Sequence, residues 1–226
     1  MTLPRAKALI SWSSGKDSAF ALHEVLRAGE LEVVGALTTV TETFGRVSIH
    51  GVRQEILCAQ LAAAGLPPTI VPIPYPCPNE IYEARISEAV ERAVRDGITH
   101  IIFGDLFLQD IRAYREQKLA GTGITPVFPL WGRPTGQLAQ QMIASGFEAY
   151  IATVDLTKLP AYFAGRKFDE QLRADLPGGV DPCGENGEFH TCVVAGPIFS
   201  RRLAVRPGER VERDGYAYCD LVLNDP

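Results

Sequence analysis

The sequence predicts an α/β protein: a parallel sheet with helices on both faces, followed by a smaller C-terminal α+β domain. Short apolar runs alternate with helical patterns over the first part of the chain, which is typical of successive βαβ units with right-handed crossovers. After Gly121 the pattern changes: the segment 125–131 carries two prolines, and from Asp181 onward glycines, prolines and β-branched residues indicate strands and turns. We therefore expect two domains, over 1–128 and 129–226.

The elements of the first domain follow from apolar periodicity and from helix-ending residues. Gly29 and Gly65 stand where helix C-caps are expected, and Asn79 is placed as an N-cap. The expected strands are 8–12, 33–38, 69–73 and 100–104, and the expected helices begin near 18, 52 and 79 and continue at 109–116.

In the C-terminal part we expect a helix near 137–145, a strand near 148–154 and further strands at 205–212 and 217–223. The segment 155–180 is expected to form a short, mixed helical insertion. The later glycines and prolines indicate turns between strands.

Composition narrows the class of protein. The 226 residues are 46% hydrophobic with a net charge of −5, so a core is expected and a broad nucleic-acid surface is not. The five cysteines are widely spaced and form no CxxC pair, which favours reduced thiols. No run reaches the roughly 18 apolar residues of a membrane span, and the N-terminus lacks signal-peptide features. We expect a cytoplasmic protein without membrane partners.

The segment 11–18, SWSSGKDS, directly follows an apolar strand and opens a helix. A helix N-terminus offers free N–H groups and a partial positive charge to a phosphate, and small residues allow close approach. A Walker A loop and a dinucleotide GxGxxG loop both fail, because only Gly15 lies in the turn and Asp17 follows Lys16. The alternative is an ordinary capped strand–turn–helix. We expect phosphate binding by Ser13, Ser14, Gly15, Lys16, Asp17 and Ser18.

A second candidate region follows the strand at 100–104. In open α/β sheets ligands lie beyond the carboxyl ends of the strands, which places Gly104 and Asp105 beside the phosphate loop. Gly104 would allow close approach to a nucleotide, and Asp105 would hold Mg²⁺ together with Asp17. Arg112 and Arg115 would meet a phosphate or a substrate carboxylate, the alternative being exposed charges on a helix.

Three further residues are considered at the same edge of the sheet. Thr38 ends the second expected strand and is assigned to ATP. His50 and Gly51 are weaker candidates for lining the nucleotide pocket, since a lone histidine is more often structural.

The segment 181–192, DPCGENGEFHTC, groups carboxylates with an imidazole. If 188–192 is extended, Glu188 and His190 share a face while Phe189 points to the core. Such a set would handle a proton from ammonia or an amine. The alternatives are a β-hairpin with polar turn residues and a zinc site of Cys183, His190 and Cys192, whose spacing is poor.

The loop SSGKDS resembles the SGGxDS loop of the PP-loop ATP pyrophosphatase superfamily, with Ser14 at the middle glycine. Together with Gly104-Asp105, the segment 129–131 and GENGEFHT, it resembles the diphthine–ammonia ligase family over nearly the whole chain. The resemblance implies a Rossmann-like adenine nucleotide α-hydrolase (HUP) domain and a substrate domain. Its eukaryotic and archaeal members activate the carboxylate of diphthine, on elongation factor 2, with ATP and ammonia.

Two departures bear on the substrate. His190 stands where the ligases tend to carry an acidic residue, and the segment 110–115 resembles a bacterial-type branch. Bacteria are not expected to make diphthamide, so we expect the ATP chemistry to be kept and leave the acceptor open.

We therefore expect an AMP-producing ligase that uses ATP and Mg²⁺, a small-molecule or protein-borne carboxylate, and ammonia or an amine; a homodimer is also considered. The alternatives are a tRNA-modifying PP-loop enzyme and a non-catalytic ATP-binding protein. The expected catalytic residues are Lys16, Asp17, Glu188 and His190. The expected substrate-binding residues are Arg112, Arg115, Glu185, Asn186, Gly187, Glu188 and Thr191.

Overall fold

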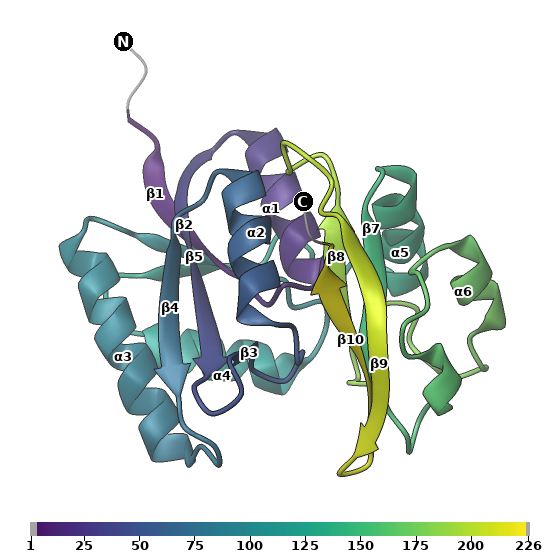
Figure 1. Ribbon diagram of the computed structural model, residues 1–226. Coiled ribbons are helices and arrows are strands. Elements are labelled where there is room, and N and C mark those ends of the chain that lie inside the picture. Colours follow the sequence, from purple (N-terminus) through teal and green to yellow (C-terminus); the bar gives the residue numbers. More distant parts are fainter. Residues whose placement is uncertain (1–3, 225–226) are drawn as a thin grey trace.

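The computed structural model describes residues 4–224, which form two sheets with helices packed between and around them (Figure 1). The strands are β1 (Ala6–Ser11), β2 (Leu31–Thr41), β3 (Arg46–Val47), β4 (Pro68–Ile73), β5 (His100–Ile102), β6 (Thr125–Val127), β7 (Glu148–Asp155), β8 (Phe189–Ala195), β9 (Val205–Arg213) and β10 (Tyr216–Leu223). The helices are α1 (Lys16–Ala28), α2 (Gln54–Ala64), α3 (Asn79–Arg95), α4 (Gln109–Leu119), α5 (Thr135–Ala144) and α6 (Glu170–Asp175), with a 3₁₀ turn at Ala161–Phe163.

The first sheet has the order β3-β2-β1-β5-β6, and β4 pairs with β2. All these pairings are parallel except that of the short β3 with β2. Chain order runs outward in one direction from β1 through β2 to β4, and in the other from β5 to β6. The switch point between β1 and β5 is where an open α/β sheet binds its ligands.

Strand β1 shows why the sheet has two covered faces. Ala8 and Ile10 lie in the core shared with α1 and α2, whereas Leu9 lies in a second core formed with α3. Alternate residues of a strand point to opposite faces, so a continuous apolar run is required where both faces are covered. This confirms the predicted α/β class.

The second sheet is antiparallel, with the order β8-β7-β10-β9. It packs against α1 and α2 on the side away from α3 (Figure 1). One continuous core joins Ile56 of α2 to Phe189 of β8, so the two sheets share apolar contacts. The boundary at residue 128 stays a prediction.

Three charged residues, Arg46, Arg53 and Asp220, form ion pairs between the second sheet and the first domain. Asp220 of β10 accepts hydrogen bonds from Arg46 at 2.9 Å and from Nε of Arg53 at 3.0 Å. Two guanidinium groups on one partly buried carboxylate favour its charged form, which keeps the pKa of Asp220 below its usual value although burial acts in the opposite direction.

Some expected boundaries were wrong by a few residues. Helix α1 begins at Lys16 rather than 18, because the extended Gly15 is its N-cap. Asn79 is the first residue of α3 and Pro78 precedes it as the N-cap, with no side-chain cap. Proline at that place fixes φ and needs no N–H partner. Among the described residues no helix has the length and apolarity to cross a membrane.

Candidate active site

The loop between β1 and α1 has a strained centre. Ser14 has a φ of 67°, in the left-handed region that residues with a Cβ rarely adopt. Its side chain is fully buried and its Oγ has no hydrogen-bond partner among the described residues. A strained residue held in a turn is a feature of ligand-binding loops.

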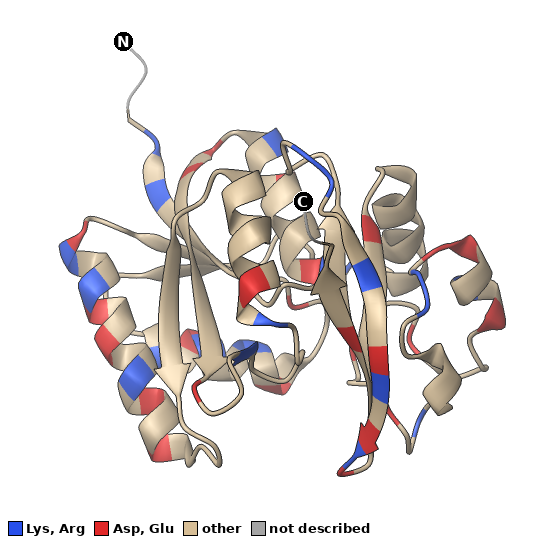
Figure 2. Cartoon of the chain, in the orientation of Figure 1, with Lys and Arg blue, Asp and Glu red and all other residues tan. Residues whose placement is uncertain are grey.

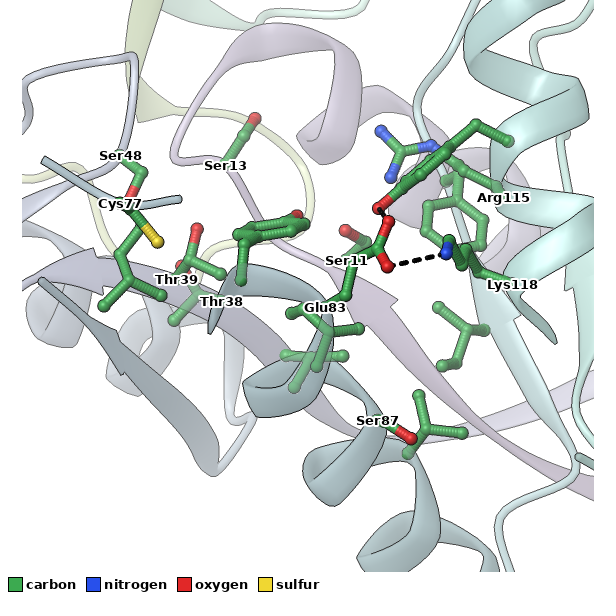
Figure 3. A pocket seen from close by; sticks show the side chains of 18 of the residues that line it. Ser11, Ser13, Thr38, Thr39, Ser48, Cys77, Glu83, Ser87, Arg115 and Lys118 are labelled. Atoms are coloured by element: carbon green, nitrogen blue, oxygen red, sulfur yellow. Dashed lines mark hydrogen bonds and ion pairs between the residues drawn. The ribbon is translucent and has the colours of Figure 1, made fainter. Parts of the chain in front are cut away.

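A cavity of about 940 Å³ opens beside this loop, at the carboxyl ends of β1, β2, β4 and β5 (Figure 3). Helices α3 and α4 form its other wall. Its volume lies within the usual range for ligand pockets, about 300–1,000 Å³. Polar groups in its wall include Ser11, Ser13, Thr38, Thr39, Ser48, His50, Glu83, Ser87, Arg115 and Lys118.

Among the described residues, the wall of the cavity holds a buried hydroxyl group without a hydrogen-bond partner and two ion pairs. Thr38 is buried in β2, three residues before the strand ends at Thr41, and its Oγ1 has no partner in the described part of the chain. Lys118 pairs with Glu83 at 2.8 Å, and Arg115 grips Asp105 with two hydrogen bonds of 2.6 and 3.0 Å (Figure 3 shows Arg115). A free buried hydroxyl and a guanidinium in one cavity suit an anionic ligand with hydroxyl groups.

Gly104 lies against the loop rather than against open space. A Cβ at this position would lie 2.8 Å from the backbone carbon of Asp17 and 2.8 Å from the nitrogen of Ser18. Glycine at this position allows the first turn of α1 to approach closely. The expected contact of Gly104 with a nucleotide stays a prediction.

Lys16 is buried and points toward the second sheet. Its Nζ donates to Oδ2 of Asp17 at 2.9 Å and to the carbonyl of Cys183, and it lies over the rings of Phe168 and Phe189 at 5.2 and 5.4 Å. Burial acts to lower the pKa of Lys16, but Asp17 and other acidic groups outweigh it, so the pKa is raised and the ammonium stays charged. Lys16 does not line the cavity.

Strand β8 covers the loop from the other side. Thr191 accepts a hydrogen bond from the backbone N–H of Lys16 at 3.0 Å, and the N–H of Val193 donates to the carbonyl of Ser14 at 2.9 Å. Gln60 of α2 donates to the carbonyl of Val193 at 2.7 Å and to that of Ser14 at 3.2 Å. The phosphate-type loop is therefore largely enclosed.

The segment 181–188 is a tight turn held by its own carboxylates. Asp181 accepts from the N–H groups of Cys183 and Glu185, and Oε1 of Glu188 accepts from the N–H of Asp181 and from Asn186. Glu188 is almost fully buried, and its Oε2 has no partner among the described residues. Gly187 has a φ of 79°, which favours glycine there.

Glu185 leaves this turn and reaches the loop after β5. Its Oε1 accepts from the backbone N–H of Leu106 at 2.7 Å. Burial raises the pKa of Glu185 to about 7, and the negative charge of Asp17 adds to this effect. A carboxyl with that pKa exchanges a proton near neutral pH.

His50 and His190 stack on each other, with ring centroids 4.6 Å apart. Burial lowers the pKa of His50 to about 3 and that of His190 to about 4, so both rings are neutral at pH 7. His50 also lines the cavity, so this pair joins the cavity to β8. Gly51 lies beside it, under the ring of Tyr218.

Arg112 lies apart from the other candidates. Its guanidinium stacks over Phe128 and Trp131 at 4.9 and 4.7 Å and pairs with Glu116 at 2.7 Å. Arg115, by contrast, lines the cavity. Of the two arginines, only Arg115 is in the wall of the cavity.

Within residues 4–224, no three His, Cys, Asp or Glu side chains gather as a metal site, so nothing supports the zinc alternative. Mg²⁺ requires fewer protein ligands, because phosphates and water complete its shell. Oδ1 of Asp17 is buried without a partner, which fits a cation, whereas both oxygens of Asp105 are held by Arg115. The donor set therefore fits Mg²⁺ at Asp17 better than at Asp105.

Sequence reasoning missed much of the cavity wall. Helix α3 contributes Tyr82, Glu83 and Ser87, of which Glu83 and Ser87 lie one helical turn apart on one face. In the sequence these residues alternate with charged residues, but a helix on the protein surface shows the same alternation. Cys77 and Lys118 were also missed, because neither belongs to a motif.

The doubly wound sheet, with a strained loop and a cavity at its switch point, defines an α/β protein of the ligand-binding type. Residues 134–222 match a family model described as diphthamide synthase C-terminal domain. Over 103 residues the chain is 32% identical to the diphthine–ammonia ligase of Rattus norvegicus and 31% to that of Bos taurus; each alignment covers 43% of this chain and 39% of the relative. The Schizosaccharomyces pombe ligase is 28% identical over 44% of this chain and 17% of its own length.

These matches agree with the predicted resemblance to the diphthine–ammonia ligase family over part of the chain. The alignments span about two-fifths of the mammalian relatives, and less of the yeast one. The bacterial-type branch stays a prediction.

Proposed function

We propose that this protein is an ATP-dependent amide-forming ligase that activates a substrate carboxylate by adenylation and releases pyrophosphate and AMP. One observation carries the proposal: a nucleotide-sized cavity reaches the strained loop at the sheet's switch point. Strand β8, within the segment that matches the diphthamide synthase C-terminal domain model, covers the same loop and supports the proposal. The relatives' name, diphthine–ammonia ligase, supports a carboxylate acceptor and ammonia as donor.

In this proposal the cavity holds ATP. The apolar part of the wall takes the adenosine, and the triphosphate extends toward Ser13, with the loop Ser13–Ser18 as its binding turn. Thr38 supplies its unpartnered hydroxyl, and Arg115 supplies a cation from the wall. Mg²⁺ bound at Asp17 would neutralise phosphate charge, and Asp105 remains a second ligand only if Arg115 releases it.

The turn 181–191 serves the acceptor and ammonia. Glu185, Asn186, Gly187 and Thr191 contact the acceptor, and Glu188 and His190 handle the proton of the attacking amine. His190 is neutral at pH 7, so one of its ring nitrogens can accept a hydrogen bond from the amine. Arg112 would serve the acceptor's carboxylate only at the rim, since it lies outside the cavity wall.

A tRNA-modifying function has less support. Lys and Arg alternate with Asp and Glu along α3 and β9 (Figure 2), a mixed surface rather than a basic stripe. Cys183 and Cys192 are buried, and burial raises the pKa of the Cys192 thiol to about 12, which opposes thiolate chemistry.

The nucleotide site is tested by protection of a thiol. Cys77 lines the cavity, whereas Cys58 is exposed on α2 outside it. ATP with Mg²⁺ should slow iodoacetamide labelling of Cys77 at least about fivefold, since a bound ligand shields its pocket, and leave Cys58 unchanged, as read by mass spectrometry. Equal labelling of Cys77 with and without ATP would refute the proposed nucleotide site.

The reaction is tested with ATP, Mg²⁺, ¹⁵N-ammonium and elongation factor 2 that carries diphthine. We expect AMP and pyrophosphate to form together with ¹⁵N incorporation, and Asp17→Asn to abolish both. Formation of ADP instead of AMP would contradict adenylation.

A further inference from the structure

Thr191 makes a hydrogen bond at the N-terminus of α1, where the first backbone N–H groups have no partner within the helix. Its Oγ1 accepts from the backbone N–H of Lys16, the first residue of α1, at 3.0 Å, and both residues are almost fully buried. The first N–H groups of a helix have no partner within the helix, and they are the groups that hold a phosphate. A phosphate oxygen and the Thr191 hydroxyl therefore need the same donor.

A second observation marks this turn as an anion site. The Oγ of Ser14, two residues before Lys16, is completely buried and has no partner among the described residues. Leaving a buried hydroxyl unpaired is costly, and an oxygen of a bound phosphate would pair it. The turn thus has one donor without an acceptor and one donor whose acceptor comes from β8.

The contact with Thr191 belongs to a larger connection. The N–H of Val193 donates to the carbonyl of Ser14, and Nζ of Lys16 donates to the carbonyl of Cys183. These bonds link the turn to both ends of the segment 183–193, which contains Glu185 and His190. These bonds connect the turn directly to the proposed acceptor site.

We propose that the Thr191 hydroxyl occupies the place of a phosphate oxygen at the Lys16 amide, and that ATP displaces it and so releases β8 from the loop. The inference rests on the proposed function, because it requires the loop to bind phosphate. Coupling of this kind is reciprocal, so an acceptor that favours the released state of β8 strengthens ATP binding.

Matched variants test the competition. Thr191→Val removes the hydroxyl and keeps the shape, and Thr191→Ser keeps the hydroxyl. We expect Thr191→Val to bind ATP and inorganic pyrophosphate about three- to tenfold more tightly than the wild type by calorimetry, since no hydrogen bond must be broken first. Thr191→Ser should stay within about twofold of the wild type. Unchanged or weaker binding by folded Thr191→Val would overturn the inference.

Hydrogen exchange of the wild type gives a second measurement that needs no variant. Saturating ATP should speed exchange of the amides at 189–193, because β8 loses its contacts with the loop. Unchanged or slower exchange in an ATP-bound protein would overturn the inference and leave the proposed function standing. A wild type that binds neither ATP nor pyrophosphate would overturn both.

Discussion

Gly104→Ala is expected to lower the free energy of unfolding by about 1–3 kcal/mol, the usual cost of inserting a methyl group into a packed site. The new Cβ would lie 2.8 Å from backbone atoms of Asp17 and Ser18, and backbone cannot rotate aside as a side chain can. The first turn of α1 must therefore shift. Urea denaturation measures the stability, and calorimetry should show ATP affinity reduced at least about tenfold, because that turn is the proposed phosphate site.

Gly136→Ala is the matched control. Gly136 lies in α5, and a Cβ there meets nothing within 4 Å. Alanine favours the helix over glycine, so this variant should gain about 0.4–1 kcal/mol and bind ATP normally. If Gly104→Ala has the stability and ATP affinity of the wild type, the prediction is wrong. The first turn of α1 then accommodates the new Cβ without cost.

The sequence predicted the alternation of strands and helices well, because a parallel sheet covered on both faces requires apolar strands such as Ala8-Leu9-Ile10. Most errors lay at element ends. The Asp214-Gly215 turn between β9 and β10 was visible as a two-residue hairpin signal: both residues have positive φ, as a type I′ turn requires. It went unused.

The site was predicted less completely, for physical reasons. Local motifs located the loop and the turn at 181–191, which are brought together by pairings between residues 175 apart in sequence. No local pattern indicates that Thr191 meets Lys16, or that the ring of His50 stacks on that of His190. Periodicity also cannot distinguish a helix face that lines a cavity from one that faces solvent, which is why Glu83 and Ser87 were missed.

The sequence placed Lys16 at the phosphates, whereas the structure buries its ammonium between Asp17 and the segment 181–188. A charged group withdrawn from water depends on its partners. Removing one partner leaves the other charge without a counter-charge, so replacing Lys16 should lower the free energy of unfolding substantially.

Lys16→Met should therefore cost up to about 3 kcal/mol of unfolding free energy; fully buried pairs lose about 3–5 kcal/mol, and Asp17 keeps part of its side chain exposed. Without the ammonium, burial raises the pKa of Asp17 further above its unfolded value. The folded variant then binds the extra proton, so its stability relative to the wild type should recover as the pH falls toward 4. Urea denaturation at pH 7 and pH 4.5 measures both effects.

The double variant Lys16→Met/Asp17→Asn separates the ion pair from packing. With the carboxylate neutralised, it should regain more than half of the stability that Lys16→Met loses at pH 7, and its stability should no longer follow the pH in this way. The double variant should also lack pyrophosphate release, because it replaces Asp17, the proposed Mg²⁺ ligand. A double variant as unstable as Lys16→Met would mean that the aliphatic chain of Lys16, packed against Phe168 and Phe189, stabilises the loop, and that the ion pair with Asp17 does not.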